Sequence, residues 1–180
     1  MIVWVNGTFG AGKTSVGTLA VERDPRLRLY DPECVGYLLR GQLSDQEFTD
    51  FQQLESWRRL VPVVADELIR EAGHHLVAIQ TVLIEDFWVE LVAGLSALGH
   101  EVLHVVVEAD EDVMRERIDV DRLEPGAREW RLNHLERYAA ARDWMTRRAD
   151  LVLDTTALTP AQATDEFWRA LDERLSRPTR

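Results

Sequence analysis

Short apolar runs alternate along the chain with segments in which apolar residues recur at helical spacing. The runs predict five strands, at Ile2–Asn6, Leu27–Asp31, Leu76–Gln80, Val102–Val107 and Leu151–Leu153. Between and after them the pattern predicts helices at about 13–23, 32–40, 54–68, 88–98, 110–118, 130–148 and 160–171. Strands that alternate with helices form a parallel sheet covered on both faces, so the predicted fold class is α/β.

Two segments depart from this regular pattern. The helix that follows Leu54 contains Pro62, which predicts a kink because proline removes a backbone hydrogen bond. The stretch 119–129 is charged, contains Pro125-Gly126 and has little to bury, so it is predicted to be a mobile surface lid. Since no repeat or linker divides the chain, residues 1–180 are expected to form one domain.

The composition narrows the class of protein. With 46% hydrophobic residues, the chain has enough apolar material for a compact core. The apolar runs are too short to cross a membrane, and no secretory leader is recognisable, so no transmembrane segment is expected. The one cysteine, Cys34, is expected in the core and cannot form an internal disulfide, which favours the cytoplasm as the location.

The charge of the chain makes one residue stand out. The net charge is −11, which argues against nucleic acid and anionic membranes as partners. Of the 21 basic residues, Lys13 is the only lysine and all the others are arginine. A small anionic ligand can still bind where local geometry concentrates positive potential.

Lys13 lies in a phosphate-binding motif. Residues 7–14, G-T-F-G-A-G-K-T, match G-x-x-x-x-G-K-[ST] between a predicted strand and a predicted helix. Such a loop points its amides at phosphate oxygens, the lysine reaches the terminal phosphates, and the hydroxyl of Thr14 holds Mg²⁺. The expected nucleotide-binding residues of this loop are Gly7, Phe9, Gly10, Ala11, Gly12, Lys13, Thr14 and Ser15.

Other features of the sequence select among the P-loop classes. A Ras-type GTPase needs an N-K-x-D motif, which a chain without a second lysine cannot supply. A water-activating ATPase usually has an acid after a buried strand, where this chain has Gln80-Thr81. A small kinase, which transfers the phosphoryl group to another bound molecule, remains.

Candidate catalytic groups follow from the predicted strand ends. Asp31 ends the second strand, so it can accept a proton from an attacking hydroxyl, hold a water on Mg²⁺, or cap the next helix. Arg117 and Arg122 flank the entry to the lid, and Arg128 and Arg131 lie at its exit. Arginines that a lid brings to the phosphates stabilise the transition state, although surface solvation explains any single one equally well.

Several motifs together resemble the tunicamycin-resistance ATP-binding proteins. They are the opening I-V-W-V-N-G-T-F-G-A-G-K-T-S, then Y-D-P-E-C-V-G-Y-L-L-R (Tyr30–Arg40), D-F-Q (Asp50–Gln52) and W-R (Trp57-Arg58). The resemblance covers roughly the first 110 residues. That family is similar to nucleoside monophosphate kinases, shikimate kinase and chloramphenicol phosphotransferase, which implies a three-layer P-loop fold with strand order 2-3-1-4-5 and a lid.

The resemblance also implies roles for individual residues. Lys13 and Thr14 match the phosphate and Mg²⁺ positions, and Asp31 matches an acidic position on the acceptor side. Arg117 resembles an arginine that stacks on adenine, and Arg122 resembles a lid arginine that acts on the phosphates with Lys13 and Asp31. The expected substrate-binding residues are Asp31, Arg40, Trp57, Arg58, Gln80 and Arg137, with Trp57 stacking on a flat or sugar ring.

The sequence therefore predicts an ATP- and Mg²⁺-dependent phosphotransferase. Its acceptor would be a hydroxyl of a small nucleoside-like or sugar-like molecule, with tunicamycin a candidate. Two alternatives stay open: a nucleotide-gated protein that sequesters the drug without chemistry, and a metabolite kinase whose effect on resistance is incidental. The oligomeric state is not predicted.

Overall fold

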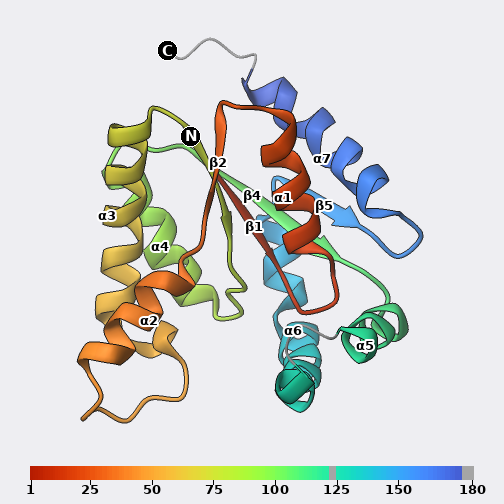
Figure 1. Cartoon of the computed structure of the whole chain (residues 1–180), viewed down its shortest axis with the longest axis horizontal. Coiled ribbons are helices and arrows are strands. Elements are labelled where there is room, and N and C mark those ends of the chain that lie inside the picture. The colour runs from red at the N-terminus through yellow and green to blue at the C-terminus, as the bar shows by residue number, and fades with distance from the viewer. Residues whose placement is uncertain (122–124, 176–180) are drawn as a thin grey trace.

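The computed structural model describes residues 1–121 and 125–175, and its centre is a five-stranded parallel sheet (Figure 1). The strands are β1 (Ile2–Gly7), β2 (Leu27–Tyr30), β3 (His75–Ile79), β4 (Val102–Glu108) and β5 (Leu151–Asp154). They lie in the order β2-β3-β1-β4-β5, and every neighbouring pair is parallel. The predicted α/β fold class and the strand order are thus confirmed.

Helices cover both faces of this sheet. They are α1 (Lys13–Arg23), α2 (Glu33–Gln42), α3 (Glu55–Ala72), α4 (Glu85–Ala97), α5 (Glu111–Val120), α6 (Arg128–Arg148) and α7 (Pro160–Leu175), with short 3-10 helices η1 (Phe51–Gln53) and η2 (Pro125–Ala127). In the described part of the chain, no helix is long and apolar enough to span a membrane.

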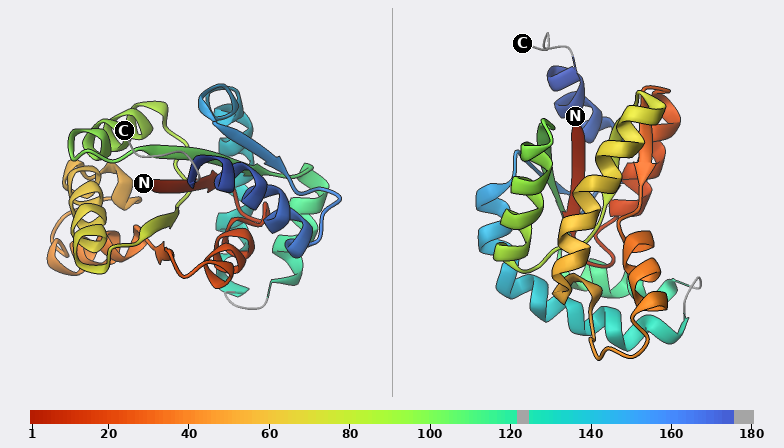
Figure 2. Two further views of the ribbon diagram at one scale, coloured as in Figure 1. Left: turned by 90° about the horizontal axis from the view of Figure 1, so that it is seen from above. Right: turned by 90° about the vertical axis from the view of Figure 1, so that its left-hand side faces the viewer.

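The central strand β1 builds two separate cores. Successive side chains of a strand point to opposite faces, so Ile2 and Trp4 enter one core while Val3 and Val5 enter the other. All four side chains are fully buried. The first core is completed by residues of α3, α4 and α6, and the second by residues of α1, α5 and α7. Figure 2 shows α7 lying alongside α1 on the second face.

The helix α3 continues through Pro62 as a single element of 18 residues. Pro62 is buried, and its ring lies against α4 at Gly94, where an added Cβ would be 2.9 Å from the Pro62 Cγ. Packing of the ring against a glycine of the neighbouring helix offsets the hydrogen bond that proline cannot make.

The predicted lid and the predicted place of Cys34 have different outcomes. Residues 119–129 contain the end of α5, the short helix η2 and the start of α6, and residues 122–124 lie outside the described residues. The motion of this segment stays a prediction.

Cys34 is exposed near the start of α2, so its expected burial is wrong. Its side chain faces outward because Val35 and Gly36 supply the buried side of that helix.

Candidate functional site

The loop between β1 and α1 has the backbone form that the phosphate-binding motif predicts. Gly7, Gly10 and Gly12 have φ angles of 133°, 75° and 100°, a region that residues with a Cβ rarely adopt. A Cβ on Gly7 would collide with the carbonyl oxygen of Val107, and one on Gly10 would lie 2.5 Å from the carbonyl oxygen of Met114. The loop therefore packs closely against β4 and α5, which only glycine allows.

Lys13 begins α1, and its side chain is buried within this loop. The Nζ atom donates a hydrogen bond to the carbonyl oxygen of Thr8 at 2.7 Å and lies 5.4 Å from the ring centroid of Phe9. Burial lowers the pKa of Lys13 to about 8, an effect that the nearby Glu33 carboxylate partly opposes. Within residues 1–121 and 125–175 no carboxylate forms an ion pair with Lys13, so a bound anion would supply the missing countercharge.

A cavity of about 720 Å³ opens in front of the loop. Its lining includes Thr8, Phe9, Gly10, Gly12, Lys13, Thr14, Ser15, Asp31, Gln80, Thr81, Arg117, Arg131 and Thr155. The side chains of Thr14 and Ser15 are exposed at the start of α1. Gly7 and Ala11 do not line this cavity, because both are buried behind the loop surface. The cavity is large enough for a nucleotide and ends at the positive end of a helix.

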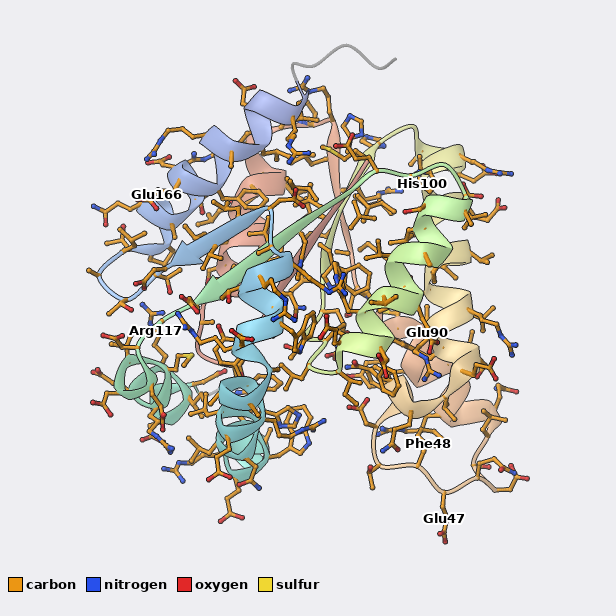
Figure 3. All side chains as sticks on the ribbon, turned by 180° about the vertical axis from the view of Figure 1, so that it is seen from behind. Glu47, Phe48, Glu90, His100, Arg117 and Glu166 are labelled. Atoms are coloured by element: carbon orange, nitrogen blue, oxygen red, sulfur yellow. The ribbon has the colours of Figure 1, made fainter. Side chains whose placement is uncertain are left out.

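Arg117, labelled in Figure 3, lines this cavity from α5, but its hydrogen bonds go to the protein. Its guanidinium group donates to the carbonyl oxygen of Gly10 at 3.1 Å and to the hydroxyl and carbonyl oxygens of Thr155 at 2.9 and 2.8 Å. The Thr155 hydroxyl in turn donates to the carbonyl oxygen of Ala11 at 2.8 Å. Arg117 thus connects the P-loop to the segment after β5. The predicted stacking of its guanidinium group on adenine stays a prediction.

A second cavity of about 300 Å³ adjoins the first. It is lined from five segments of the chain, by Phe9, Glu33, Tyr37, Arg40, Thr49, Asp50, Phe51, Gln52, Gln53, Gln80, Thr81, Leu83, Ile84, Phe87, Trp130, His134 and Arg137. Four of these residues line the larger cavity as well, namely Phe9, Glu33, Gln80 and Thr81. The two cavities therefore meet beside the phosphate-binding loop.

Polar side chains converge where the cavities meet. The Thr81 hydroxyl donates to the carbonyl oxygen of Gly7 at 2.7 Å, which fixes the segment after β3 to the P-loop. Gln80 is 4% exposed, and its Nε2 donates to the Thr81 carbonyl oxygen at 3.2 Å. The Oε1 atom of Gln80 has no hydrogen-bond partner among the described residues. A buried acceptor in this condition favours a ligand or water that donates to it.

Arg40 of α2 and Arg137 of α6 both line the second cavity. Arg137 donates to Nε2 of His134 at 3.2 Å, while Nδ1 of His134 lies 2.7 Å from the Trp130 carbonyl oxygen. Burial lowers the pKa of His134, which favours the neutral ring that can accept from Arg137. Arg40 lies over the ring of Phe48 at 5.6 Å. In the ranges that the structure describes, neither arginine is part of an ion pair.

The structure places Trp57 and Arg58, two of the predicted substrate-binding residues, in the lining of neither cavity. Trp57 is fully buried, and its Nε1 donates to the carbonyl oxygen of Pro32 at 3.1 Å, so no face of its ring is open to a ligand. Arg58 donates to the Gln52 carbonyl oxygen at 2.6 Å, pairs with Glu90 and lies over a phenylalanine ring. Neither side chain lines a cavity. Both support the segment 50–53, which does.

Asp31 fulfils one of the roles that the sequence left open, and its chemical roles stay predictions. Its Oδ1 accepts a hydrogen bond from the backbone amide of Glu33 at 2.9 Å, so it caps the start of α2. Its exposed carboxylate lines the larger cavity but not the smaller one. Arg122, the predicted lid arginine, lies outside the described residues, and its role stays a prediction.

Sequence reasoning missed an aromatic wall of the smaller cavity. The rings of Phe9, Trp130 and His134 pack together, with centroids 4.9 Å apart for Phe9 and Trp130 and 4.2 Å for Trp130 and His134. Trp130 is still 53% exposed. Tyr37 and Phe51 form another aromatic pair across the cavity lining, at 6.4 Å. A large apolar residue at the polar start of the helix after the lid was the one available signal for Trp130.

Comparison with known proteins agrees with this geometry. A structure of the Deinococcus radiodurans tunicamycin resistance protein is similar over 95% of each chain, with 26% identity and a TM-score of 0.72. A sugar kinase from Janibacter is 17% identical with a TM-score of 0.66, covering 95% of this chain and 94% of that one. Mycobacterium tuberculosis APS kinase, solved with AMPPNP and APS, is 17% identical with a TM-score of 0.62, covering 95% and 96%. A search of curated proteins gives no match.

These similarities confirm the predicted resemblance to tunicamycin-resistance proteins and a P-loop kinase-like fold of the nucleotide-binding type. The profile of the AAA domain family matches residues 2–140, which include the P-loop and most of the residues that line both cavities. The chain therefore belongs to the AAA domain family.

Proposed function

We propose that the protein is a small-molecule kinase that transfers the terminal phosphoryl group of ATP to a hydroxyl of a nucleoside-like or sugar-like acceptor. The observation that carries this proposal is the meeting of two cavities beside the P-loop. A phosphoryl donor in the larger cavity and an acceptor in the smaller one would approach each other there. A protein that only hydrolyses a nucleotide needs no second cavity of this kind.

The donor side fits a triphosphate. The loop amides and the start of α1 offer positive potential to the phosphates, and the buried Lys13 ammonium supplies a compact charge within the larger cavity. Arg117 braces the loop through Gly10 and Thr155, which keeps those amides in place while charge develops on the phosphate. The APS kinase structure with AMPPNP supports a nucleotide as the ligand of this fold.

The residues around the phosphates also fit Mg²⁺. The exposed hydroxyl of Thr14 and the carboxylate of Asp31 line the same cavity, and both offer the oxygen ligands that Mg²⁺ prefers. Thr14 would hold the metal directly, and Asp31 would hold one of its waters. When bound, Mg²⁺ neutralises charge on the phosphate oxygens.

The acceptor side fits a ring with polar substituents. Aromatic side chains offer stacking surfaces, and Gln80, Arg40 and Arg137 offer hydrogen bonds from several directions. The structural similarity to a tunicamycin resistance protein supports tunicamycin as the first acceptor to test. The sugar kinase of the same fold supports a sugar hydroxyl as the chemical class.

The proposal is tested by incubating the protein with ATP, Mg²⁺ and tunicamycin, and separately with a panel of nucleosides and sugars. Mass spectrometry should show one acceptor that gains the mass of a phosphate. A protein that binds ATP and tunicamycin but forms no such product would instead favour sequestration of the drug. Transfer to a nucleoside or sugar of the panel, with tunicamycin unchanged, would favour a metabolite kinase.

A further inference from the structure

Two of the acidic residues that line the cavities, Asp31 and Glu33, lie at the start of α2 and occupy different places. Asp31 lines only the larger cavity, and its carboxylate is engaged with its own helix, where Oδ1 accepts from the Glu33 amide and Oδ2 lies 3.8 Å from the Cys34 sulfur. Glu33 lies two residues further on, and its side chain lines both cavities. Glu33 is therefore the acid at the point where donor and acceptor would meet.

The surroundings of Glu33 give its carboxylate a defined orientation and a suitable electrostatic setting. The Tyr37 hydroxyl, one helical turn later, donates to Oε2 of Glu33 at 3.0 Å. The carboxylate also acts electrostatically on Lys13, whose ammonium group occupies the phosphate end of the larger cavity. The Tyr37 hydrogen bond and the nearby Lys13 charge thus orient this carboxylate toward the place where the cavities meet.

Gln80 offers a second acceptor at the same place. Its buried Oε1 atom has no hydrogen-bond partner in the described ranges, and the side chain lines both cavities. An acceptor molecule with two neighbouring hydroxyls would donate one to Glu33 and one to Gln80. This arrangement selects a polyhydroxylated ring over an isolated alcohol.

We infer that Glu33, rather than Asp31, is the catalytic carboxylate that binds the attacking hydroxyl of a polyhydroxylated acceptor and receives its proton. The inference rests on the proposed kinase function. In the transfer step the acceptor oxygen forms a bond to the γ-phosphorus. The bond from that phosphorus to the bridging oxygen breaks, its electron pair leaves on ADP, and the hydroxyl proton passes to Glu33.

The experiment compares Glu33→Gln with Asp31→Asn, which each replace a carboxylate by an amide of the same shape. The acceptor is the one that the wild-type protein phosphorylates in the screen above, and each variant is also titrated with a non-hydrolysable ATP analogue. Glu33→Gln should lower the turnover number about 100-fold or more while its nucleotide affinity stays within about threefold. Asp31→Asn should weaken binding of the magnesium nucleotide and lower turnover less than Glu33→Gln does.

Two further variants keep the test decisive. Glu47→Gln removes the same carboxylate from an exposed position on the loop after α2, where Figure 3 shows the side chain pointing away from the molecule, and it should leave turnover unchanged. Tyr37→Phe keeps Glu33 but removes its hydrogen bond, and it should lower turnover by about threefold to tenfold. Circular dichroism and unfolding curves establish that each variant is folded.

The outcomes separate this inference from the proposed function. If the wild-type protein transfers phosphate but Glu33→Gln keeps more than about a third of the turnover, the role of Glu33 is wrong and the kinase proposal stands. A larger loss in Asp31→Asn than in Glu33→Gln would also overturn it. If the wild-type protein transfers phosphate to no acceptor, both the kinase proposal and the role of Glu33 fail together.

Discussion

The two cavities of the site are constructed in different ways. The phosphate end of the larger one is formed by one continuous segment, residues 8–15, whose glycines and backbone amides create the phosphate-binding surface. The smaller one is formed by side chains from α2, the segment 49–53, the segment after β3, α4 and α6. Few substitutions fit a surface made of backbone atoms, because a Cβ at its glycines would clash with neighbouring atoms. A surface made of side chains from separate segments can be altered by single substitutions.

This difference predicts that the larger cavity binds the donor and the smaller one selects the acceptor. The donor is common to many kinases, so a conserved backbone geometry suits the larger cavity. The acceptor differs between kinases, and a lining drawn from separate segments can be altered without disturbing the P-loop. Substitutions in the two cavities should therefore have different kinetic effects. Those in the larger cavity should lower turnover with every acceptor, and those in the smaller cavity should change the KM of one acceptor.

The largest effect is expected from Lys13→Met, which keeps the length of the side chain but removes its charge. Without the ammonium group, charge that develops on the transferring phosphate loses a buried partner, so turnover should fall about 10²–10³-fold with every acceptor. Steady-state kinetics measure this loss. Arg169→Met removes one positive charge from an exposed position on α7 and should leave turnover unchanged. A Lys13→Met protein with near-normal turnover would contradict a phosphate-binding role for the loop.

A smaller and more selective effect is expected from Arg137→Leu. Loss of a charged hydrogen-bond donor from the smaller cavity should raise the acceptor KM about 10–100-fold, while the affinity for the ATP analogue changes less than about twofold. Isothermal titration and initial rates measure the two quantities. Arg142→Leu is the matched control on the same helix, because Arg142 pairs with Glu108 and lines neither cavity. Equal losses in both affinities would contradict the division between the cavities.

The contrast also explains how much the sequence could predict. Both helical layers and the phosphate loop follow from local patterns, since strands that alternate with helices form a covered parallel sheet and the loop motif is contiguous. The strand order was implied by the resemblance to a known family, and the structure confirms it. Trp130, Glu33 and Tyr37 became site residues only when the fold brought α2 and α6 to the same cavity. No periodicity along the chain encodes that proximity.

The positions of Trp57 and Arg58 outside both cavities have physical reasons as well. Trp57 belongs to the apolar face of α3 with Val61 and Ala65, and this helical spacing indicated burial more strongly than stacking on a ligand. Arg58 was expected to face the acceptor, but an arginine that finds a backbone carbonyl and Glu90 within reach is engaged before any ligand binds. A sequence shows the charge of a residue and not the partners that satisfy it.

The affinity of the larger cavity for the magnesium nucleotide should depend on pH through Lys13. The pKa of Lys13 is about 8 in the protein without a ligand, and bound phosphate favours the charged form. Affinity for the magnesium nucleotide should therefore be greatest below about pH 8 and fall by up to about tenfold per pH unit above it, with uptake of a proton on binding. Titration calorimetry in buffers of different ionisation enthalpy measures both. In Lys13→Arg the guanidinium group stays protonated, so a slope that persists there would assign the effect to another group.

The smallest effect is expected from Trp57→Phe, and it concerns stability. Loss of the Nε1 hydrogen bond to Pro32 and of part of a buried ring should lower the free energy of unfolding by about 1–3 kcal/mol, as measured by urea denaturation. The acceptor KM should stay within about twofold, because Trp57 touches no cavity. Trp130→Leu should raise the acceptor KM and leave the free energy of unfolding nearly unchanged. Its half-exposed ring contributes little to folding but forms a wall of the smaller cavity. A raised acceptor KM in Trp57→Phe with unchanged stability would restore Trp57 to the site and contradict its burial.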